Sequence, residues 1–121
     1  MVSTIVKSVQ RKGRGVFAGQ RIKAGTLIES CPVILFDVVQ GESHLLEEYA
    51  FRWSKKKVAI ALGNGSLYNH SYQPNAEYLQ DKDNKCILVY ALNDIPKGTE
   101  ICFNYNGHPE NKTKLWFKVR D

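Results

Sequence analysis

Short apolar runs rich in β-branched residues alternate with glycine-rich and polar turns along most of the chain. This alternation is typical of short strands, which we expect at 4–9, 15–18, 58–62, 76–80, 86–92 and 100–105. Two further runs, at 26–30 and 33–39, flank Pro32, which we expect to end or bend a strand. The polar segment "DKDNK" at 81–85 predicts a hairpin turn between its neighbouring strands.

One segment has helical spacing instead. In "HLLEEYAFRW", residues 44–53, the side chains of Leu45, Tyr49 and Trp53 recur at every fourth position. We therefore predict one short helix there, in a fold that is otherwise mostly β and built from several small curved sheets.

Two segments far apart in the chain share one pattern. Both "RIKAGTLI" at 21–28 and "DIPKGTEI" at 94–101 contain an Ile, then Gly-Thr, then a second Ile. In each, the glycine allows a backbone conformation that other residues adopt at a cost, and a strand-like run follows. The sequence thus predicts one turn type used twice, with no duplicated function implied.

Length and composition indicate one small globular domain spanning residues 1–121. A chain of 121 residues can bury one core but not two, and a hydrophobic content of 43% argues against disorder. No apolar run approaches the roughly 20 residues of a membrane helix, and the first residues lack the features of a signal peptide. We therefore expect no association with a membrane.

The three cysteines, Cys31, Cys86 and Cys102, are not spaced as metal-ligand pairs. Each lies in an apolar run, which favours buried, reduced thiols in an intracellular protein. We expect no metal site formed by this chain.

The net charge of +5 is unevenly distributed. Residues 1–28 carry only basic charges, residues 29–48 carry only acidic ones, and basic residues return in "RWSKKK". Each block can be a solvated face, or the acidic block, which includes Glu42, Glu47 and Glu48, can attract a basic ligand. A basic patch for nucleic acid is the weaker alternative, because no motif of a nucleic-acid-binding fold accompanies it.

The segment "LYNHSYQPN" at 67–75 fits neither a strand nor a helix. It follows "GNGS", lacks apolar alternation and contains Pro74. It is also longer than an ordinary turn requires. A row of polar and ring-bearing side chains in such a loop indicates that the loop holds something.

Three segments together resemble the SET-domain family of protein lysine methyltransferases. They are "KGRGVFA" at 12–18, "NHSYQPN" at 69–75 and "GTEICFNYNG" at 98–107. The family pattern is Gly-x-Gly, then Asn-His-Ser-x-x-Pro-Asn, then Glu-x-x-[Phe/Tyr]-[Asp/Asn]-Tyr. The resemblance covers nearly the whole chain and implies a minimal SET core, a mostly β fold of the β-clip type. It also implies a knot-like crossing of the 69–75 loop with the 100–105 strand.

The resemblance implies S-adenosylmethionine as the cofactor. Carried over residue by residue, the Asn69 side chain should bond the cofactor and the His70 main chain should bond its adenine. Arg14 and the main chain at Gly15 should contact the methionine end, and Trp116 or its neighbour should stack on the adenine. Read without the motif, His70 would be a hydrogen-bonded core histidine.

Tyr105 is the catalytic residue that the resemblance implies. Methyl transfer from a sulfonium needs a neutral amine, whereas the unperturbed pKa of lysine is about 10.4. A narrow apolar channel disfavours the ammonium, and a tyrosine hydroxyl can orient the amine without the carboxylate that would stabilise the ammonium. Tyr49, Tyr68 and Phe103 are candidates for the channel wall, with plain core packing as the alternative for each. A Phe at position 103 implies room for di- or trimethylation.

Some residues depart from the family pattern. Asn104 stands where Asp is frequent, and Asn106 stands where Gly often follows the tyrosine. No cysteine cluster follows Tyr105, so the zinc-binding tail of many relatives is not expected, and residues 114–119 or a partner subunit must cover the cofactor.

The sequence therefore predicts an enzyme that methylates lysine side chains in basic peptides or proteins, with histone tails as one candidate substrate. The alternative is a catalytically weak SET-like module that binds a basic peptide or the cofactor. A homodimer is expected because so small a domain has a limited core, and nucleic acid is not required. The expected location is intracellular: the cytoplasm of a bacterium, or the host nucleus for a viral chain.

Overall fold

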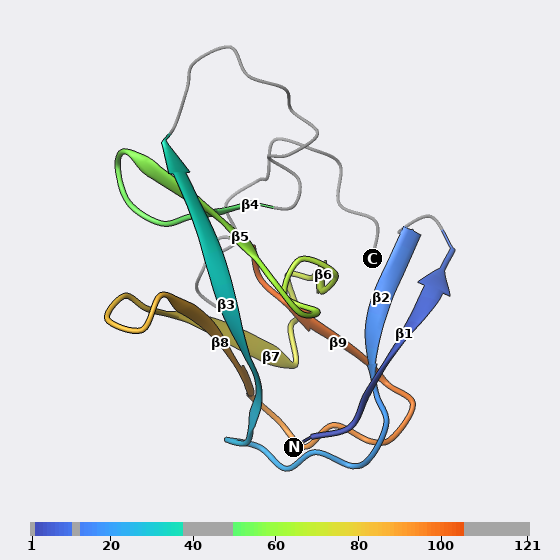
Figure 1. Ribbon diagram of the computed structural model, residues 1–121. Coiled ribbons are helices and arrows are strands. Elements are labelled where there is room, and N and C mark those ends of the chain that lie inside the picture. Colours follow the sequence, from blue (N-terminus) through green and yellow to red (C-terminus); the bar gives the residue numbers. More distant parts are fainter. Residues whose placement is uncertain (1, 11–12, 38–49, 106–121) are drawn as a thin grey trace.

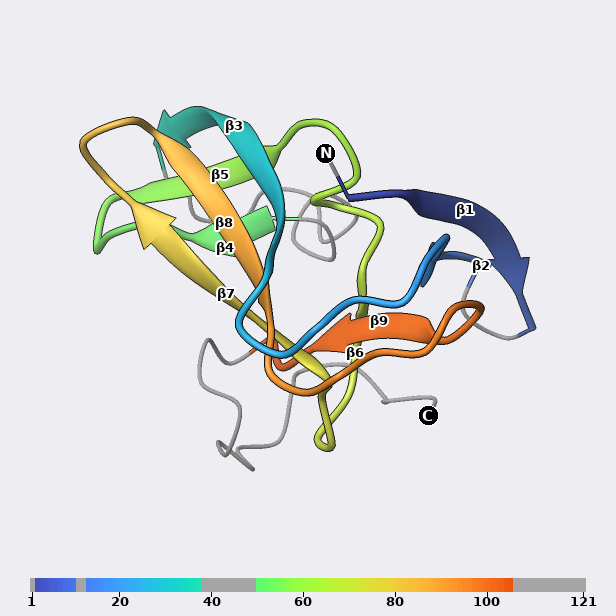
Figure 2. The same cartoon turned by 90° about the horizontal axis from the view of Figure 1, so that it is seen from below.

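The computed structural model describes residues 2–10, 13–37 and 50–105. Within these ranges nine strands form two sheets, with strand orders β1-β2-β9-β6 and β4-β5-β3-β8-β7. The β1–β2 hairpin lies on one side of the molecule and the five-stranded sheet on the other, with β6 and β9 between them (Figures 1 and 2). The predicted mostly β fold of small curved sheets is confirmed.

The four-stranded sheet joins segments from the two ends of the described chain. Strands β1 (Thr4–Val9) and β2 (Gly13–Ala18) form an antiparallel hairpin. Strand β9 (Glu100–Phe103) pairs antiparallel with β2 on one side and parallel with β6 (Asn69–His70) on the other. The 69–75 segment was expected to be a loop throughout, yet its first two residues form this short strand.

The long strand β3 (Leu27–Asp37) is the centre of the five-stranded sheet. Its first half pairs with β8 (Cys86–Ala91) and its second half with β5 (Lys57–Ala61). The edge strands are β7 (Ala76–Asp81), next to β8, and β4 (Ala50–Arg52), next to β5. Residues 81–85 make the predicted connection between β7 and β8.

Pro32 was expected to end or bend a strand, and it does not end one. It lies inside β3, opposite Cys86, and pairing with β5 begins at the next residue, Val33. The proline thus occupies the position where β3 changes its main partner. A residue without a backbone N–H is tolerated there because neither ladder has to run uninterrupted through it.

The predicted helix over 44–53 is wrong at its C-terminal end, where the chain forms β4. Phe51 and Trp53 are buried and Arg52 between them is exposed, which is the two-residue period of a strand. Pairing of β4 with the edge of β5 satisfies its backbone and outweighs the helical spacing. Residues 44–49 lie outside the described part of the chain. Nothing in the described ranges is a helix with the length and apolar character needed to cross a membrane.

The core lies between the sheets and is filled by buried side chains from strands other than β1. Val16, Ile87, Val89 and Ile101 are fully buried. Cys31 belongs to the same cluster, as expected for a buried thiol, whereas Cys86 and Cys102 are only half-buried. Apolar side chains also cover the outer face of the five-stranded sheet, where Ile34 remains 49% exposed.

The two echoed segments form the same turn and pair with each other. Gly25 and Gly98 have φ values of 84° and 88°, in the left-handed region that favours glycine. Ile22 and Ile95 exchange two backbone hydrogen bonds, of 2.9 and 2.7 Å. Because one segment links β2 to β3 and the other links β8 to β9, this bridge ties together two of the connections between the sheets.

We predict that Gly25→Ala and Gly98→Ala each lower the free energy of unfolding by about 1–2 kcal/mol, the cost of a left-handed backbone for a residue with a Cβ. A Cβ at either position meets no atom within 4 Å, so the loss should come from the backbone alone. Chemical denaturation measures it, with Lys97→Ala, an exposed neighbour, as control. Losses no larger than that of the control would contradict the assignment of a strained turn.

Candidate functional site

The 69–75 segment crosses β9 and is bonded to it at both ends. At its start, β6 pairs with β9 and the Ser71 N–H donates to the Phe103 carbonyl at 3.1 Å. At its end, the Asn75 side chain donates to the Glu100 carbonyl and accepts from the Cys102 N–H, both at 2.9 Å. The Asn75 amide therefore takes the place of a strand residue beside β9, and the predicted crossing is confirmed.

Next to the crossing, Asn69 connects β6, β9 and the hairpin β1–β2. Its Nδ2 donates to Oε2 of Glu100 at 2.6 Å and to the Arg14 carbonyl at 3.1 Å. Both partners are acceptors, so the amide oxygen of Asn69 is directed away from them. Glu100 thus makes the structural hydrogen bond predicted for it.

Gly15 is required by these side chains. A Cβ at position 15 would lie 2.5 Å from Oε2 of Glu100 and 2.9 Å from Nδ2 of Asn69, closer than real Cβ atoms approach. The sequence predicted a glycine that lets the backbone approach a ligand. The structure adds a second reason, because the Asn69–Glu100 pair packs directly against the Cα atom.

The His70 ring organises the crossing. It is buried, and its Nδ1 accepts a hydrogen bond from the Tyr105 N–H at 2.9 Å. The edges of Tyr72 and Tyr105 face it, with ring centroids 4.4 and 5.2 Å away. The ring therefore has the role of a hydrogen-bonded core histidine, and the contact of its main chain with adenine stays a prediction.

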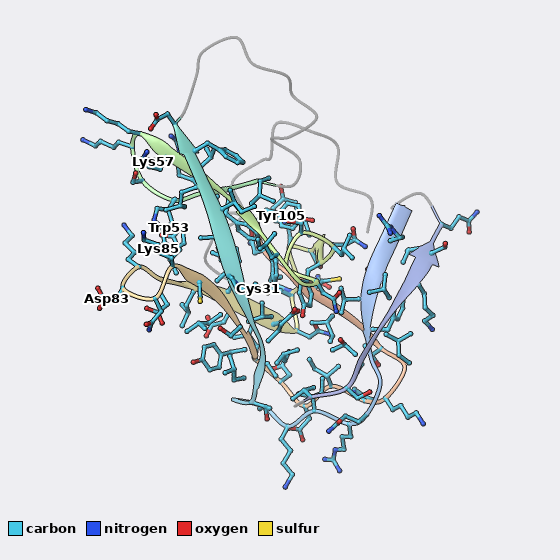
Figure 3. The ribbon with its side chains drawn as sticks, viewed as in Figure 1. Cys31, Trp53, Lys57, Asp83, Lys85 and Tyr105 are labelled. Carbon is cyan, nitrogen blue, oxygen red and sulfur yellow. The ribbon has the colours of Figure 1, made fainter. Side chains whose placement is uncertain are left out.

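Tyr105 follows the end of β9 and is fixed through three groups. Its N–H bonds to His70, its carbonyl accepts from the Tyr78 hydroxyl at 3.1 Å, and its own hydroxyl donates to the Tyr68 carbonyl at 2.5 Å. In Figure 3 it lies near the centre of the molecule, close to β6 and β9, whereas Lys57, Asp83 and Lys85 lie at the rim. The hydroxyl proton is thus committed to a main-chain acceptor.

An aromatic cluster surrounds this position, with the fully buried Phe103 at its centre. The centroid of the Phe103 ring lies 4.9 Å from that of Tyr78, 5.2 Å from Tyr68, 5.8 Å from Tyr105 and 5.9 Å from Phe51. Sequence reasoning brought Phe103, Tyr68 and Tyr105 together but missed Phe51 and Tyr78. Strand alternation through "AEYLQ" was the available signal for Tyr78.

Burial keeps the hydroxyls of Tyr78 and Tyr68 protonated. It raises the pKa of Tyr78 to about 12. Burial, together with the nearby carboxylate of Glu29, also raises the pKa of Tyr68. The Tyr68 hydroxyl donates to Oε1 of Glu29 at 2.7 Å, and the Tyr68 carbonyl accepts from the Tyr105 hydroxyl.

Two acids of the predicted acidic block have partners inside this protein. Glu29 bonds Tyr68, and Asp37 forms an ion pair with Lys57 at 2.6 Å. The other three, Glu42, Glu47 and Glu48, lie outside the described part of the chain, as do the predicted site residues Tyr49 and Trp116. The structure brings the remaining predicted residues into two adjoining groups: Arg14, Gly15 and Asn69, and His70, Tyr68, Phe103 and Tyr105.

This combination of fold and site defines a class of protein. The SET domain family matches residues 13–106. A histone-lysine N-methyltransferase of Schizosaccharomyces pombe, specific for histone H3 lysine 37, is 39% identical over an alignment of 117 residues. The alignment covers 93% of this chain and 76% of that protein. The crystal structure of a candidate histone methyltransferase from Plasmodium falciparum superposes with a TM-score of 0.72 at 33% identity, covering 88% of this chain and 98% of that one.

The chain belongs to the SET-domain family. It is a protein-lysine N-methyltransferase, the enzyme class that the three motifs predicted.

We predict that Asn75→Ala lowers the free energy of unfolding by about 1–3 kcal/mol, because it leaves a donor and an acceptor of β9 without their partner. Asn93→Ala, at an exposed position after β8, is the matched control. Equal stability of the two variants in urea denaturation would mean that the Asn75 side chain does not hold β9.

Proposed function

We propose that the chain transfers a methyl group from S-adenosylmethionine to the side-chain amine of a lysine in a histone tail, with Tyr105 orienting the amine. The observation that carries the proposal is the Tyr105 hydroxyl, held against the Tyr68 carbonyl inside an aromatic cluster. The matched family and the histone-lysine methyltransferase of Schizosaccharomyces pombe support the reaction and the substrate class.

The residues near β2 fit the amino-acid end of the cofactor. The Arg14 carbonyl and the Asn69 amide oxygen are acceptors, which suits an ammonium group. The exposed Arg14 side chain supplies a positive charge for a carboxylate on the same turn. Because Gly15 has no side chain, the Asn69 side chain can lie directly against the main chain of β2. When bound, the cofactor supplies an electrophilic methyl group on a sulfonium.

Tyr105 sets the direction of the amine. Because the hydroxyl gives its proton to the Tyr68 carbonyl, it presents its oxygen as an acceptor. An amine that donates an N–H to this oxygen keeps its nitrogen lone pair for attack in another direction. A correctly oriented lone pair is the main requirement of an in-line displacement, so the contribution of Tyr105 is one of positioning within hydrogen-bond contact.

The aromatic surroundings favour a neutral lysine. Phe51, Phe103 and Tyr78 provide three rings and one protonated hydroxyl in place of carboxylates. Transfer of an ammonium into such surroundings lowers its pKa. Rings also accept the methylated cation through cation–π contact. We propose that Phe103, which has no hydroxyl to occupy space beside the amine, permits di- or trimethylation.

A non-catalytic SET-like module is the alternative function. The lysine methyltransferase relative and the intact hydrogen bonds of Tyr105 both favour the enzyme. The alternative would gain support if the protein bound cofactor but transferred no methyl group to any histone or lysate protein. A histone substrate would place the enzyme with chromatin inside the cell.

We predict that S-adenosylmethionine and its demethylated product raise the melting temperature, since a ligand that binds only the folded state stabilises it. Asn69→Ala should reduce the shift by weakening binding by about 1–3 kcal/mol. Asn93→Ala, far along the chain from Asn69, is the control. Wild-type protein that shows no shift at millimolar cofactor would contradict the proposed cofactor.

We predict that Tyr105→Phe lowers kcat about 100-fold, which corresponds to about 2.7 kcal/mol. Only the hydroxyl is lost, so the fold and the thermal shift with the demethylated cofactor should persist. Transfer of label from the cofactor to histone H3 measures the rate. A variant that methylates at the wild-type rate would show that Tyr105 does not orient the amine.

We also propose that the enzyme is a homodimer that pairs through the outer face of its five-stranded sheet. Four apolar side chains on this face are widely exposed: Ile34 (49%), Leu79 (48%), Leu62 (43%) and Phe36 (37%). They lie beside further apolar residues in register, with Ile34 opposite Ile60 and Leu79 opposite Leu88. An apolar area of this kind marks an interaction surface.

Charge at the rim of this face favours a second copy as the partner. Lys57 and Asp37 form an ion pair there, and Lys85 and Asp83 lie at the same side of the sheet (Figure 3). Because the rim carries both signs, a copy related by a two-fold axis can place opposite charges against each other. Sheet-on-sheet packing would then cover the apolar centre.

We predict that Ile34→Lys converts a dimer into a monomer, measured by light scattering after size-exclusion chromatography. Ile5→Lys is a matched control, since Ile5 is 47% exposed on the other sheet and should leave the dimer intact. A monomeric wild type at micromolar concentration, or a dimer unaffected by Ile34→Lys, would refute the interface.

A further inference from the structure

Glu29 is a half-buried acid of β3, and both of its carboxylate oxygens accept hydrogen bonds from one segment. Oε1 accepts from the Tyr68 hydroxyl at 2.7 Å and Oε2 accepts from the Asn64 N–H at 2.9 Å. Gly63 adopts a φ of 64°, and a Cβ there would lie 2.5 Å from Oε2. The turn at 63–68 is thus wrapped closely around the carboxylate.

A bulge in β3 directs Glu29 into this position. The pairing of β3 with β8 shifts register between Leu27 and Glu29. As a result, Ile28 is buried and the following Glu29 is half-buried as well, whereas an unbroken strand would turn them to opposite faces. Bulges commonly re-aim side chains near functional sites.

The segment that Glu29 holds ends directly at the catalytic crossing. Its two anchored residues, Asn64 and Tyr68, are joined through a turn in which the Leu67 N–H donates to the Asn64 carbonyl at 2.9 Å. Tyr68 then precedes the Asn-His pair of β6, and its carbonyl accepts the Tyr105 hydroxyl. A movement of Tyr68 therefore moves the acceptor that orients this hydroxyl.

Packing alone does not explain the Glu29–Tyr68 pair. A Phe at position 68 would fill nearly the same space against Phe103 without the need to bury a hydroxyl and, with it, part of a carboxylate. Such buried polar pairs contribute little net stability compared with apolar residues. Their advantage is that they fix one geometry, which is what a reactive group needs from the residues behind it.

We propose that Glu29 is a positioning residue of the methyl transfer: it fixes Tyr68 so that the Tyr68 carbonyl holds the Tyr105 hydroxyl in its accepting orientation. This inference rests on the proposed role of Tyr105. The three groups form one connected series from the five-stranded sheet to the crossing, namely the Glu29 carboxylate, Tyr68 and the Tyr105 hydroxyl.

The test is a double-mutant cycle in the full chain. Tyr68→Phe removes the hydroxyl with its volume conserved, and Glu29→Gln keeps the shape but replaces one acceptor oxygen by a donor. Each is made in the wild type and in Tyr105→Phe, and kcat and KM are measured with a histone H3 peptide under saturating S-adenosylmethionine. Glu77→Gln and Tyr90→Phe, which face each other on β7 and β8 away from this series, are matched controls.

We expect Glu29→Gln and Tyr68→Phe each to lower kcat about tenfold in the wild type, with KM changed by less than twofold. In Tyr105→Phe, neither should lower kcat further, because the hydroxyl they position is gone. An equal loss in both backgrounds, or none in the wild type, would overturn the proposal. If Tyr105→Phe alone has the wild-type rate, the proposed role of Tyr105 fails. A lower kcat in Glu29→Gln would then have a cause other than the orientation of the Tyr105 hydroxyl. Should Glu29→Gln fold poorly, Tyr68→Phe decides alone.

Discussion

The architecture of this enzyme depends on how β9 is held. One strand of four residues pairs with β2 from the start of the chain and with β6 from its middle, and the Asn75 side chain bonds it as well. These partners are separated by tens of residues, so all of the contacts that hold β9 are long-range. The position of this one short strand therefore depends on several distant parts of the chain.

Each group of the candidate site depends on this arrangement. The Asn69–Glu100 bond spans β6 and β9, and it packs on Gly15 of β2. Beyond the end of β9, the Tyr105 N–H reaches the His70 ring. Polar side chains thus hold the crossing on one side, and aromatic rings fill the space on the other. The result is an edge that carries the Arg14 carbonyl and the Asn69 amide, beside a cluster of aromatic rings around Phe103.

Much of this could be predicted from the sequence, and the limits have physical causes. Alternation located most strands, and the motifs brought Asn69, His70 and Tyr105 together although they are far apart in the chain. The helix over 44–53 failed at β4 because Trp53 satisfies a four-residue and a two-residue period alike, and the pairing with β5 decides between them. Glu29 was missed because a bulge sets its direction, and alternation assigns directions only in regular strands. The apolar outer face was missed because its residues come from four strands whose order is not encoded locally.

For a reaction that needs a neutral amine, the placement of the carboxylates matters as much as the placement of the aromatic rings. A carboxylate in contact with the substrate amine would stabilise the ammonium and remove the nucleophile. Here the negative charge of Glu29 is separated from Tyr105 by the whole of Tyr68, whose hydroxyl remains protonated because burial and Glu29 itself both raise its pKa. Glu100 is similarly engaged by the Asn69 amide. Acidic groups can therefore fix the geometry of the candidate site from behind, while the surface proposed to meet the amine consists of rings, a hydroxyl and main-chain carbonyls. This division lets one small domain combine rigid hydrogen bonding with a reaction that needs an uncharged amine.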